Sequence, residues 1–191
     1  MNQLFHIITF LSITIFSMAQ ETESGLYSTN DGFVKFVSDA PLEFITAESE
    51  SLKGLVDPEK RTFAFRLDVN TLKGFNSPLQ QEHFYENYME TDQFPTAQFS
   101  GKIIEELNMN SEAWQTIRAK GTIEIHGISQ ERIIKCMIRI EGDKMEVKSN
   151  FTVLLAEHNI TIPKLVYQKI AEEIKVVINA IMTKQESSGS Q

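Results

Sequence analysis

Residues 80–101 read Q-Q-E-H-F-Y-E-N-Y-M-E-T-D-Q-F-P-T-A-Q-F-S-G and change from a helical to a strand pattern within a few residues. Up to Met89 the aromatic and apolar side chains recur at helical spacing, while glutamates lie four residues apart on another face. Pro95 then favours extended backbone, and beyond it apolar residues alternate with polar ones, as in a half-buried strand. The sequence therefore predicts a short amphipathic helix that leads into a β-sheet.

The same two-residue alternation returns along most of the chain. It is clearest at 61–69, where Phe63, Phe65, Leu67 and Val69 share one face. Further strands are predicted at 32–37, 42–47, 52–56, 97–104, 114–126, 132–140, 145–155 and 174–182. The chain thus contains eight or nine predicted strands, with aliphatic or aromatic residues on one face of each.

Short turns such as 57–60 and 142–143 join these strands. Strict alternation favours antiparallel pairing, and about eight strands satisfy their edges when the sheet closes into a barrel. Residues 163–173 have apolar side chains at helical spacing after a proline, which predicts a second short helix. We therefore expect an all-β, mainly antiparallel fold: a closed barrel of about eight strands with two short helical insertions, in one domain.

Three segments carry a recognisable family pattern. The first contains His83-Phe84, Tyr88-Met89, Phe94-Pro95 and Phe99; the others are G-T-I-E-I-H-G-I-S at 121–129 and F-T-V-L-L-A-E-H-N-I-T-I-P at 151–163. In this order they resemble the YceI-like family of lipid- or polyisoprenoid-binding proteins. Two positions differ, because the common pattern has an acidic residue at Gln81 and a double Phe at Tyr88-Met89. The resemblance covers about residues 26–183 and implies a bacterial, lipocalin-like barrel around a long isoprenoid or fatty chain.

The predicted inward faces are rich in aromatic residues, and 13 residues of the chain are Phe. Such faces fill a packed core as readily as they line a cavity, and periodicity does not separate the two. The resemblance favours a cavity that encloses one apolar ligand. The residues that we expect to contact this ligand are Phe63, Phe65, Leu67, Phe84, Tyr88, Phe99, Ile125 and Phe151.

Residues 4–16 form an apolar run without Asp, Glu, Lys or Arg, followed by Ser17-Met18-Ala19. We interpret residues 1–19 as a signal peptide that is cleaved before Gln20. A membrane anchor is the alternative, but such a run spans about 20 Å as a helix, short of the roughly 30 Å hydrocarbon core. We therefore expect a periplasmic or secreted protein, not stably inserted in a membrane after cleavage, with its domain at 20–183 and a disordered polar tail at 184–191.

The chain is acidic, with 26 Asp and Glu against 18 Lys and Arg and a formal net charge of −8. This charge argues against nucleic-acid binding, which needs a basic surface to neutralise phosphates, and it disfavours docking on anionic headgroups. Cys136 is the only cysteine, so no intramolecular disulfide forms, and its apolar neighbours predict a buried structural thiol.

Catalytic and metal-binding patterns are weak. His83 lies near Glu82 and Glu86, but helical zinc motifs need a further His at fixed spacing, and residue 87 is Asn. We expect no metal site, no catalytic residue and no cofactor, and we expect His83 to orient the helix through a local hydrogen bond. The enzymatic alternative is an acid–base reaction on an isoprenoid substrate, with His83 and a neighbouring carboxylate as its groups.

The function predicted is therefore binding rather than catalysis. An exported protein would enclose an isoprenoid, a quinone or a fatty acyl chain in its barrel for transport or storage. The remaining alternative is a structural or interaction barrel with a solid core and no ligand. The expected partner is thus a hydrophobic small molecule or lipid and not nucleic acid, and the protein is expected to be a monomer or a homodimer.

Overall fold

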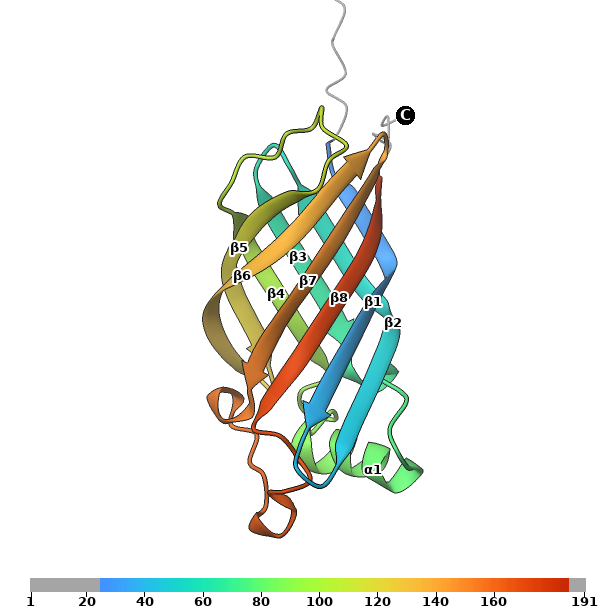
Figure 1. Cartoon of the computed structure of the whole chain (residues 1–191), viewed down its shortest axis with the longest axis vertical. Helices are drawn as coiled ribbons and strands as arrows, with labels where there is room; N and C mark the ends of the chain where they lie inside the picture. Colours follow the sequence, from blue (N-terminus) through green and yellow to red (C-terminus); the bar gives the residue numbers. More distant parts are fainter. Residues whose placement is uncertain (1–24, 186–191) are drawn as a thin grey trace, which may run out of the picture.

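The computed structural model describes residues 25–185, which form a closed eight-stranded barrel (Figure 1). The strands follow one another around the barrel in sequence order, each antiparallel to its neighbours, and the last pairs with the first. They are β1 (Tyr27–Asp39), β2 (Phe44–Asp57), β3 (Thr62–Asp68), β4 (Thr96–Ile103), β5 (Gln115–Ile125), β6 (Ile128–Glu141), β7 (Lys144–Leu154) and β8 (Glu173–Lys184). The closed antiparallel barrel predicted from the alternation is confirmed.

Strand β2 runs through both of the strands that we predicted at 42–47 and 52–56, so the prediction of two strands is wrong there. Ser49 and Leu52 are both buried although they lie three residues apart. On the facing strand β1 the pairing register shifts on both sides of Gly32. Such a β-bulge moves the following side chains to the other face and breaks the two-residue period without ending the strand.

The first predicted helix is present and changes character halfway. It begins as α1 (Pro78–His83) after Ser77, whose hydroxyl accepts a hydrogen bond from the Gln80 N–H at 3.1 Å. It then continues as one π-helical turn, η2 (Phe84–Tyr88), closed by the Met89 N–H donating to the Phe84 carbonyl at 2.9 Å. The wider π turn is a local departure of the kind that often occurs at functional sites.

The second predicted helix, at 163–173, is wrong. Only a 3₁₀ turn forms there, η4 (Lys164–Val166), and from Glu173 onward the chain is held in β8 by pairing with β7. Backbone groups of this segment bond to other parts of the chain instead, since the Gln168 carbonyl accepts from the Leu42 N–H and the Ala171 N–H donates to the Ser38 hydroxyl. The other 3₁₀ turns of the described residues are η1 (Val69–Thr71) and η3 (Leu155–His158).

A packed core closes the upper end of the barrel in Figure 1, where the β2–β3, β4–β5 and β6–β7 connections lie. Every strand contributes to it, and Met145 and Met182 have no exposed surface. Cys136 belongs to this core, and burial raises the pKa of its thiol above the ordinary value. The prediction of a buried structural thiol is therefore confirmed.

The ends of the chain are only partly described. The predicted signal peptide at 1–19 and residues 186–191 of the predicted tail lie outside the described residues. Lys184, which we assigned to the tail, is the last residue of β8 and pairs with Tyr27. Between residues 25 and 185, no helix has the length and apolar character needed to cross a membrane.

Gly101 on β4 and Gly121 on β5 face each other at a point where the two backbones come unusually close. A Cβ atom on Gly101 would lie 2.2 Å from the Lys120 carbonyl oxygen and 2.5 Å from the Gly121 Cα. Because both obstacles are backbone atoms, no rotamer change relieves them. A side chain at either position would force the two strands apart.

We predict that Gly101→Ala lowers the free energy of unfolding by about 1 to 3 kcal/mol, the usual range for overpacking a close contact. Urea unfolding followed by circular dichroism measures the change. Ser100→Ala is the matched control, since Ser100 is the exposed neighbour on the same strand, and it should change stability by no more than about 0.5 kcal/mol. Equal effects of the two substitutions would contradict this account of the close approach.

Candidate functional site

The lower end of the barrel in Figure 1 is open and leads into a cavity of about 390 Å³. This volume lies in the range of about 300 to 1,000 Å³ that is usual for small-molecule sites. Three segments surround the mouth: the β1–β2 turn, the helical segment α1–η2 and the β7–β8 connection. The candidate site is therefore the interior of the barrel at its open, lower end.

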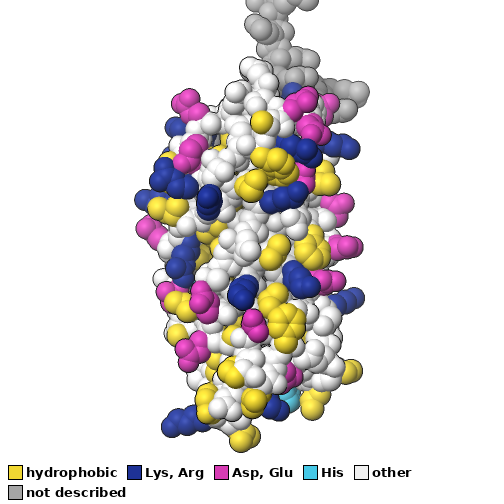
Figure 2. All heavy atoms as spheres, viewed as in Figure 1, with side chains coloured by type: hydrophobic (Ala, Val, Ile, Leu, Met, Phe, Trp, Pro, Cys, Tyr) yellow, Lys and Arg dark blue, Asp and Glu magenta, His cyan; other side chains and the backbone are white. Residues whose placement is uncertain are grey.

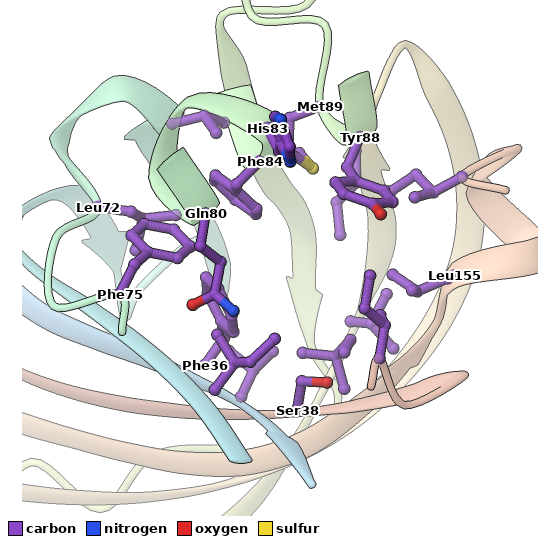
Figure 3. A pocket seen from close by; sticks show the side chains of 18 of the residues that line it. Phe36, Ser38, Leu72, Phe75, Gln80, His83, Phe84, Tyr88, Met89 and Leu155 are labelled. Carbon is purple, nitrogen blue, oxygen red and sulfur yellow. The ribbon is translucent and has the colours of Figure 1, made fainter. Parts of the chain in front are cut away.

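Aromatic side chains form one wall of this cavity (Figure 3). Phe84 of η2 stacks on Phe36 of β1 with ring centroids 5.3 Å apart, and its centroid is 4.9 Å from that of Phe75. Such contacts contribute about 0.5 to 1.5 kcal/mol each beyond the burial of area. The helical segment is thus attached to the barrel wall by the same rings that line the cavity.

Tyr85 holds the outer side of this helical segment. Its hydroxyl donates to the Leu72 carbonyl and accepts a hydrogen bond from Gln81 Nε2 at 2.9 Å. Tyr85 therefore points to the η1 side, while Phe84 and Tyr88 at either end of the π turn line the cavity. Gln81, at the position where the family pattern has an acid, has a structural partner here.

A second, smaller cavity of about 170 Å³ lies deeper in the barrel. It has residues in common with the mouth cavity, namely Val34, Leu67, Ala97, Ile125 and Val176. Phe65 lines the inner cavity and packs against both the upper core and the cluster around the mouth. Its ring lies over Gly54 on β2, where a Cβ atom would be 2.4 Å from the ring. Phe65 therefore stands at the boundary between the packed and the hollow parts.

All eight residues expected to contact a ligand lie on these walls. Leu67, Phe84, Tyr88 and Ile125 line the mouth cavity. The residues lining the inner cavity are Phe63, Phe65, Leu67, Phe99, Ile125 and Phe151. The structure thus brings residues of β3, η2, β4, β5 and β7 to one interior.

Sequence reasoning missed several other lining residues, including Phe36, Leu72 and Phe75. Phe36 had a usable signal, because it alternates with Val34 on the first predicted strand. Phe75 had none, since it lies in a loop beside Gly74, where no period applies.

Polar lining groups lie mainly at the mouth. Gln80 Nε2 donates to Glu43 Oε1 at 2.8 Å, and the Ser38 hydroxyl accepts from the Ala171 N–H at 2.8 Å. Tyr88 differs from these groups, because its hydroxyl points into the cavity and has no hydrogen-bond partner among residues 25–185 (Figure 3). Burial raises the pKa of this phenol, so it remains a neutral donor at ordinary pH. The Tyr88 hydroxyl is thus a free donor that points into the cavity.

His83 does not make the local hydrogen bond that we expected, so that expectation is wrong. The side chain is exposed at the mouth of the cavity, and no described residue hydrogen-bonds to its ring. Glu43 lines the same cavity but is bonded to Gln80. Among residues 25–185, no three His, Cys, Asp or Glu side chains lie close enough together to hold a metal ion.

Two other histidines fix the lower rim instead. His126, in the β5–β6 turn, hydrogen-bonds through Nε2 to Glu90 Oε2 at 2.7 Å and donates from Nδ1 to the His158 carbonyl at 3.0 Å. The ring of Phe94 packs edge-on against it at 4.7 Å. The segment after η2, the β5–β6 turn and η3 are therefore held together through one imidazole ring.

His158 is completely buried beneath this contact. Its Nδ1–H donates to the Ile128 carbonyl at 3.1 Å, and its Nε2 has no hydrogen-bond partner. Burial lowers the pKa of His158, and the nearby positive charge of Arg132 and His126 lowers it further, while the bond to the Ile128 carbonyl opposes the shift in part. The neutral imidazole is therefore the form that the fold accommodates.

The sequence and the fold were compared with known proteins. A family model for the YceI-like domain matches residues 27–182. No curated protein sequence matches the chain.

Several solved structures share the fold at low sequence identity. A polyisoprenoid binding domain from Saccharophagus degradans, implicated in plant cell wall breakdown, has a TM-score of 0.70 at 12% identity, covering 84% of this chain and 99% of that one. BcnA of Burkholderia cenocepacia has a TM-score of 0.65 at 12% identity, covering 80% of this chain and 96% of its own. The Campylobacter jejuni YCEI protein has a TM-score of 0.55 at 11% identity, covering 97% and 94%. These likenesses concern the fold.

We predict that acidification below about pH 6.5 destabilises the protein through His158. Because the pKa of His158 is lowered on folding, the unfolded state binds the proton first, and stability falls as pH drops from the unfolded pKa toward the folded one. Between pH 7 and pH 5 the wild type should lose more unfolding free energy than His158→Asn, whose amide keeps a donor for the Ile128 carbonyl. Urea unfolding at each pH measures this difference. Equal losses of unfolding free energy in the wild type and in His158→Asn would show that His158 does not cause the destabilisation at low pH.

Proposed function

Because the chain belongs to the YceI-like domain family, we propose that it binds a long apolar molecule inside its barrel without catalysing a reaction on it. Isoprenoids, quinones and fatty acyl chains are the ligand class. A structural neighbour described as a polyisoprenoid binding domain supports this class.

One observation carries the proposal: an open mouth leads into an apolar interior that extends past Phe65 toward the packed core. Each fully buried CH₂ group contributes about 0.8 kcal/mol, so a long chain gains affinity along its whole length without a charged anchor. A barrel that served only as a structural module would have no use for this hollow half, because filling it would add stability.

The free hydroxyl of Tyr88 narrows the ligand class to chains that carry a hydrogen-bond acceptor. A quinone carbonyl, a hydroxyl or an ester oxygen would take the donor that no described residue uses. At the rim, Gln80 already has partners for both its amide oxygen and its amide nitrogen, so it would contribute shape rather than new bonds.

We propose further that the protein acts outside the cytoplasm. The apolar run at 4–16 followed by Ser17-Met18-Ala19 supports cleavage of a signal peptide. Carriage of a water-insoluble ligand between sites, or its storage, is the role that a closed apolar interior suits.

Native mass spectrometry of the purified protein tests the proposal. We expect the protein to carry, or to take up from detergent solution, one apolar molecule from a panel of a quinone, a polyprenol and a fatty acid. Ligand uptake should raise the unfolding temperature in proportion to the logarithm of ligand concentration. A protein that takes up no member of the panel above background would contradict the proposal.

Phe65→Trp sharpens this experiment. The larger ring should close the passage between the two cavities and shorten the longest chain that is taken up, while stability changes by less than about 1 kcal/mol because empty volume absorbs the ring. If side chains filled the space between the two cavities, Phe65→Trp would lower the free energy of unfolding by about 1 to 3 kcal/mol, and neither protein would take up a ligand. Leu55→Trp is the control, since Leu55 is 43% exposed beside Gly54. Mass spectrometry and thermal unfolding of both variants separate the outcomes.

Tyr88→Phe tests whether the Tyr88 hydroxyl hydrogen-bonds to a polar end group of the ligand. Since no protein partner is lost, stability should change by less than about 0.5 kcal/mol. Affinity for a long-chain alcohol should fall about threefold to tenfold, the worth of one neutral hydrogen bond, while affinity for the alkane of equal length should not fall. Competition against a fluorescent fatty acid measures both affinities. Equal effects on the two affinities would show that the Tyr88 hydroxyl does not hydrogen-bond to the polar end group of the ligand.

A further inference from the structure

The rim of the open end exposes large apolar side chains. The three most exposed large hydrophobic residues among 25–185 are Leu165 at 94%, Leu42 at 67% and Tyr167 at 63%, and all three lie on this rim. Leu79 of α1 and Phe44 at the start of β2 are 59% and 58% exposed at the same end. Figure 2 shows yellow side chains at the lower end of the molecule.

Hydrogen bonds hold these exposed residues in one surface. The Leu42 N–H donates to the Gln168 carbonyl at 2.9 Å, which joins the β1–β2 turn to the β7–β8 connection. On the other side, Asn76 Nδ2 donates to the Phe44 carbonyl at 3.0 Å, which joins the same turn to the segment before α1. The exposure is therefore built into the fold and is shared by three segments.

The β7–β8 connection has two apolar faces. Val166 and Ile170 line the mouth cavity, while Leu165 and Tyr167 point away from it. An apolar surface thus continues from the interior of the barrel over the rim to the outside. A chain leaving the cavity would keep apolar contact on one side along this surface.

The charge of this connection differs from that of the whole chain. The net charge of the chain is −8, whereas the middle of this connection, residues 159–171, contains Lys164 and Lys169 and no Asp or Glu; the acidic residues Glu157 and Glu172 lie at its two ends. Neither lysine forms an ion pair within the described residues. An exposed leucine and tyrosine between two free lysines is the arrangement that places apolar groups among acyl chains and ammonium groups at lipid phosphates.

We propose that this rim, formed by Leu42, Phe44, Leu79, Leu165 and Tyr167 with Lys164 and Lys169, docks on the surface of a phospholipid bilayer. Leu165 and Tyr167 enter the headgroup region, the lysines contact phosphates, and the mouth of the cavity faces the lipid. The docking goes beyond ligand binding and is measurable on ligand-free protein. A negative result for docking therefore does not contradict ligand binding, and the reverse also holds.

A bilayer suits this rim better than a second copy of the chain. A symmetric dimer through the rim would take Lys164 and Lys169 of both copies out of water, and burying charged groups is costly even when carboxylates pair with them. Phosphates neutralise the same charges. A convex loop tip with one fully exposed leucine also enters a fluid headgroup layer without a matching pocket, which a protein surface would have to supply.

Co-flotation with phosphatidylcholine vesicles, with and without phosphatidylglycerol, tests the proposal. The protein is used as it is purified from cells, with its N-terminus as the cells have processed it. Leu165→Ser should lower the partition coefficient about tenfold for both vesicles. Ile133→Ser is the matched control, because Ile133 is 58% exposed on the outer wall of β6, and it should bind like wild type. Lys164→Gln with Lys169→Gln should lower binding most on phosphatidylglycerol vesicles in low salt.

Tryptophan fluorescence reports which end of the barrel touches the lipid. The only native tryptophan, Trp114, precedes β5 at the opposite end, where Gly25 also lies. Brominated phosphatidylcholine should quench an added tryptophan in Tyr167→Trp and leave Trp114 unquenched. Quenching of Trp114 instead would show attachment through the other end of the barrel and would overturn the proposal.

Three further results would overturn the docking proposal. One is vesicle binding that Leu165→Ser and Ile133→Ser reduce equally, and another is no vesicle binding at all. The third is a wild-type dimer in sedimentation equilibrium that Leu165→Ser converts to a monomer, which would assign the rim to a second copy of the chain.

Discussion

The pairing of β8 with β1 closes the barrel, and the rest of the structure depends on this closure. The other seven pairings join strands that are neighbours in sequence, whereas β1 and β8 pair residues as distant as Tyr27 and Lys184. Once the sheet is closed, every inward side chain shares one interior of fixed radius. Whether that interior is full or hollow is then a question of how much side-chain volume each level of the barrel receives.

The two ends of the barrel answer this question differently. At the upper end residues from all eight strands fill the space around Met145 and Met182. At the lower end the helical segment α1–η2 covers the barrel from one side without filling it. The aromatic contacts of Phe84 hold this cover at the wall, so the space beneath it stays open.

The lower rim combines rigid and exposed parts. His126 and the buried His158 tie the segment after η2 to the β5–β6 turn and to η3. Beyond η3 the β7–β8 connection presents Leu165 outward and Val166 inward. An apolar ligand that enters through this rim would pass from an exposed apolar surface to an enclosed one, and the free hydroxyl of Tyr88 lies along its path.

The sequence alone determined most of the strands, their antiparallel pairing, most inward faces and the first helix. Alternation of Phe63, Phe65 and Leu67 was sufficient for β3, because the side-chain period of a strand is a local property of the backbone. Tertiary structure decided the rest. The bulge in β1–β2, the π turn after His83, the 3₁₀ turn in place of a second helix and the exposure of Leu165 each depend on which segment packs alongside. The cavity depends on all eight strands together. Its volume is the volume enclosed by the barrel minus the summed volume of the inward side chains, and no single stretch of sequence determines either quantity.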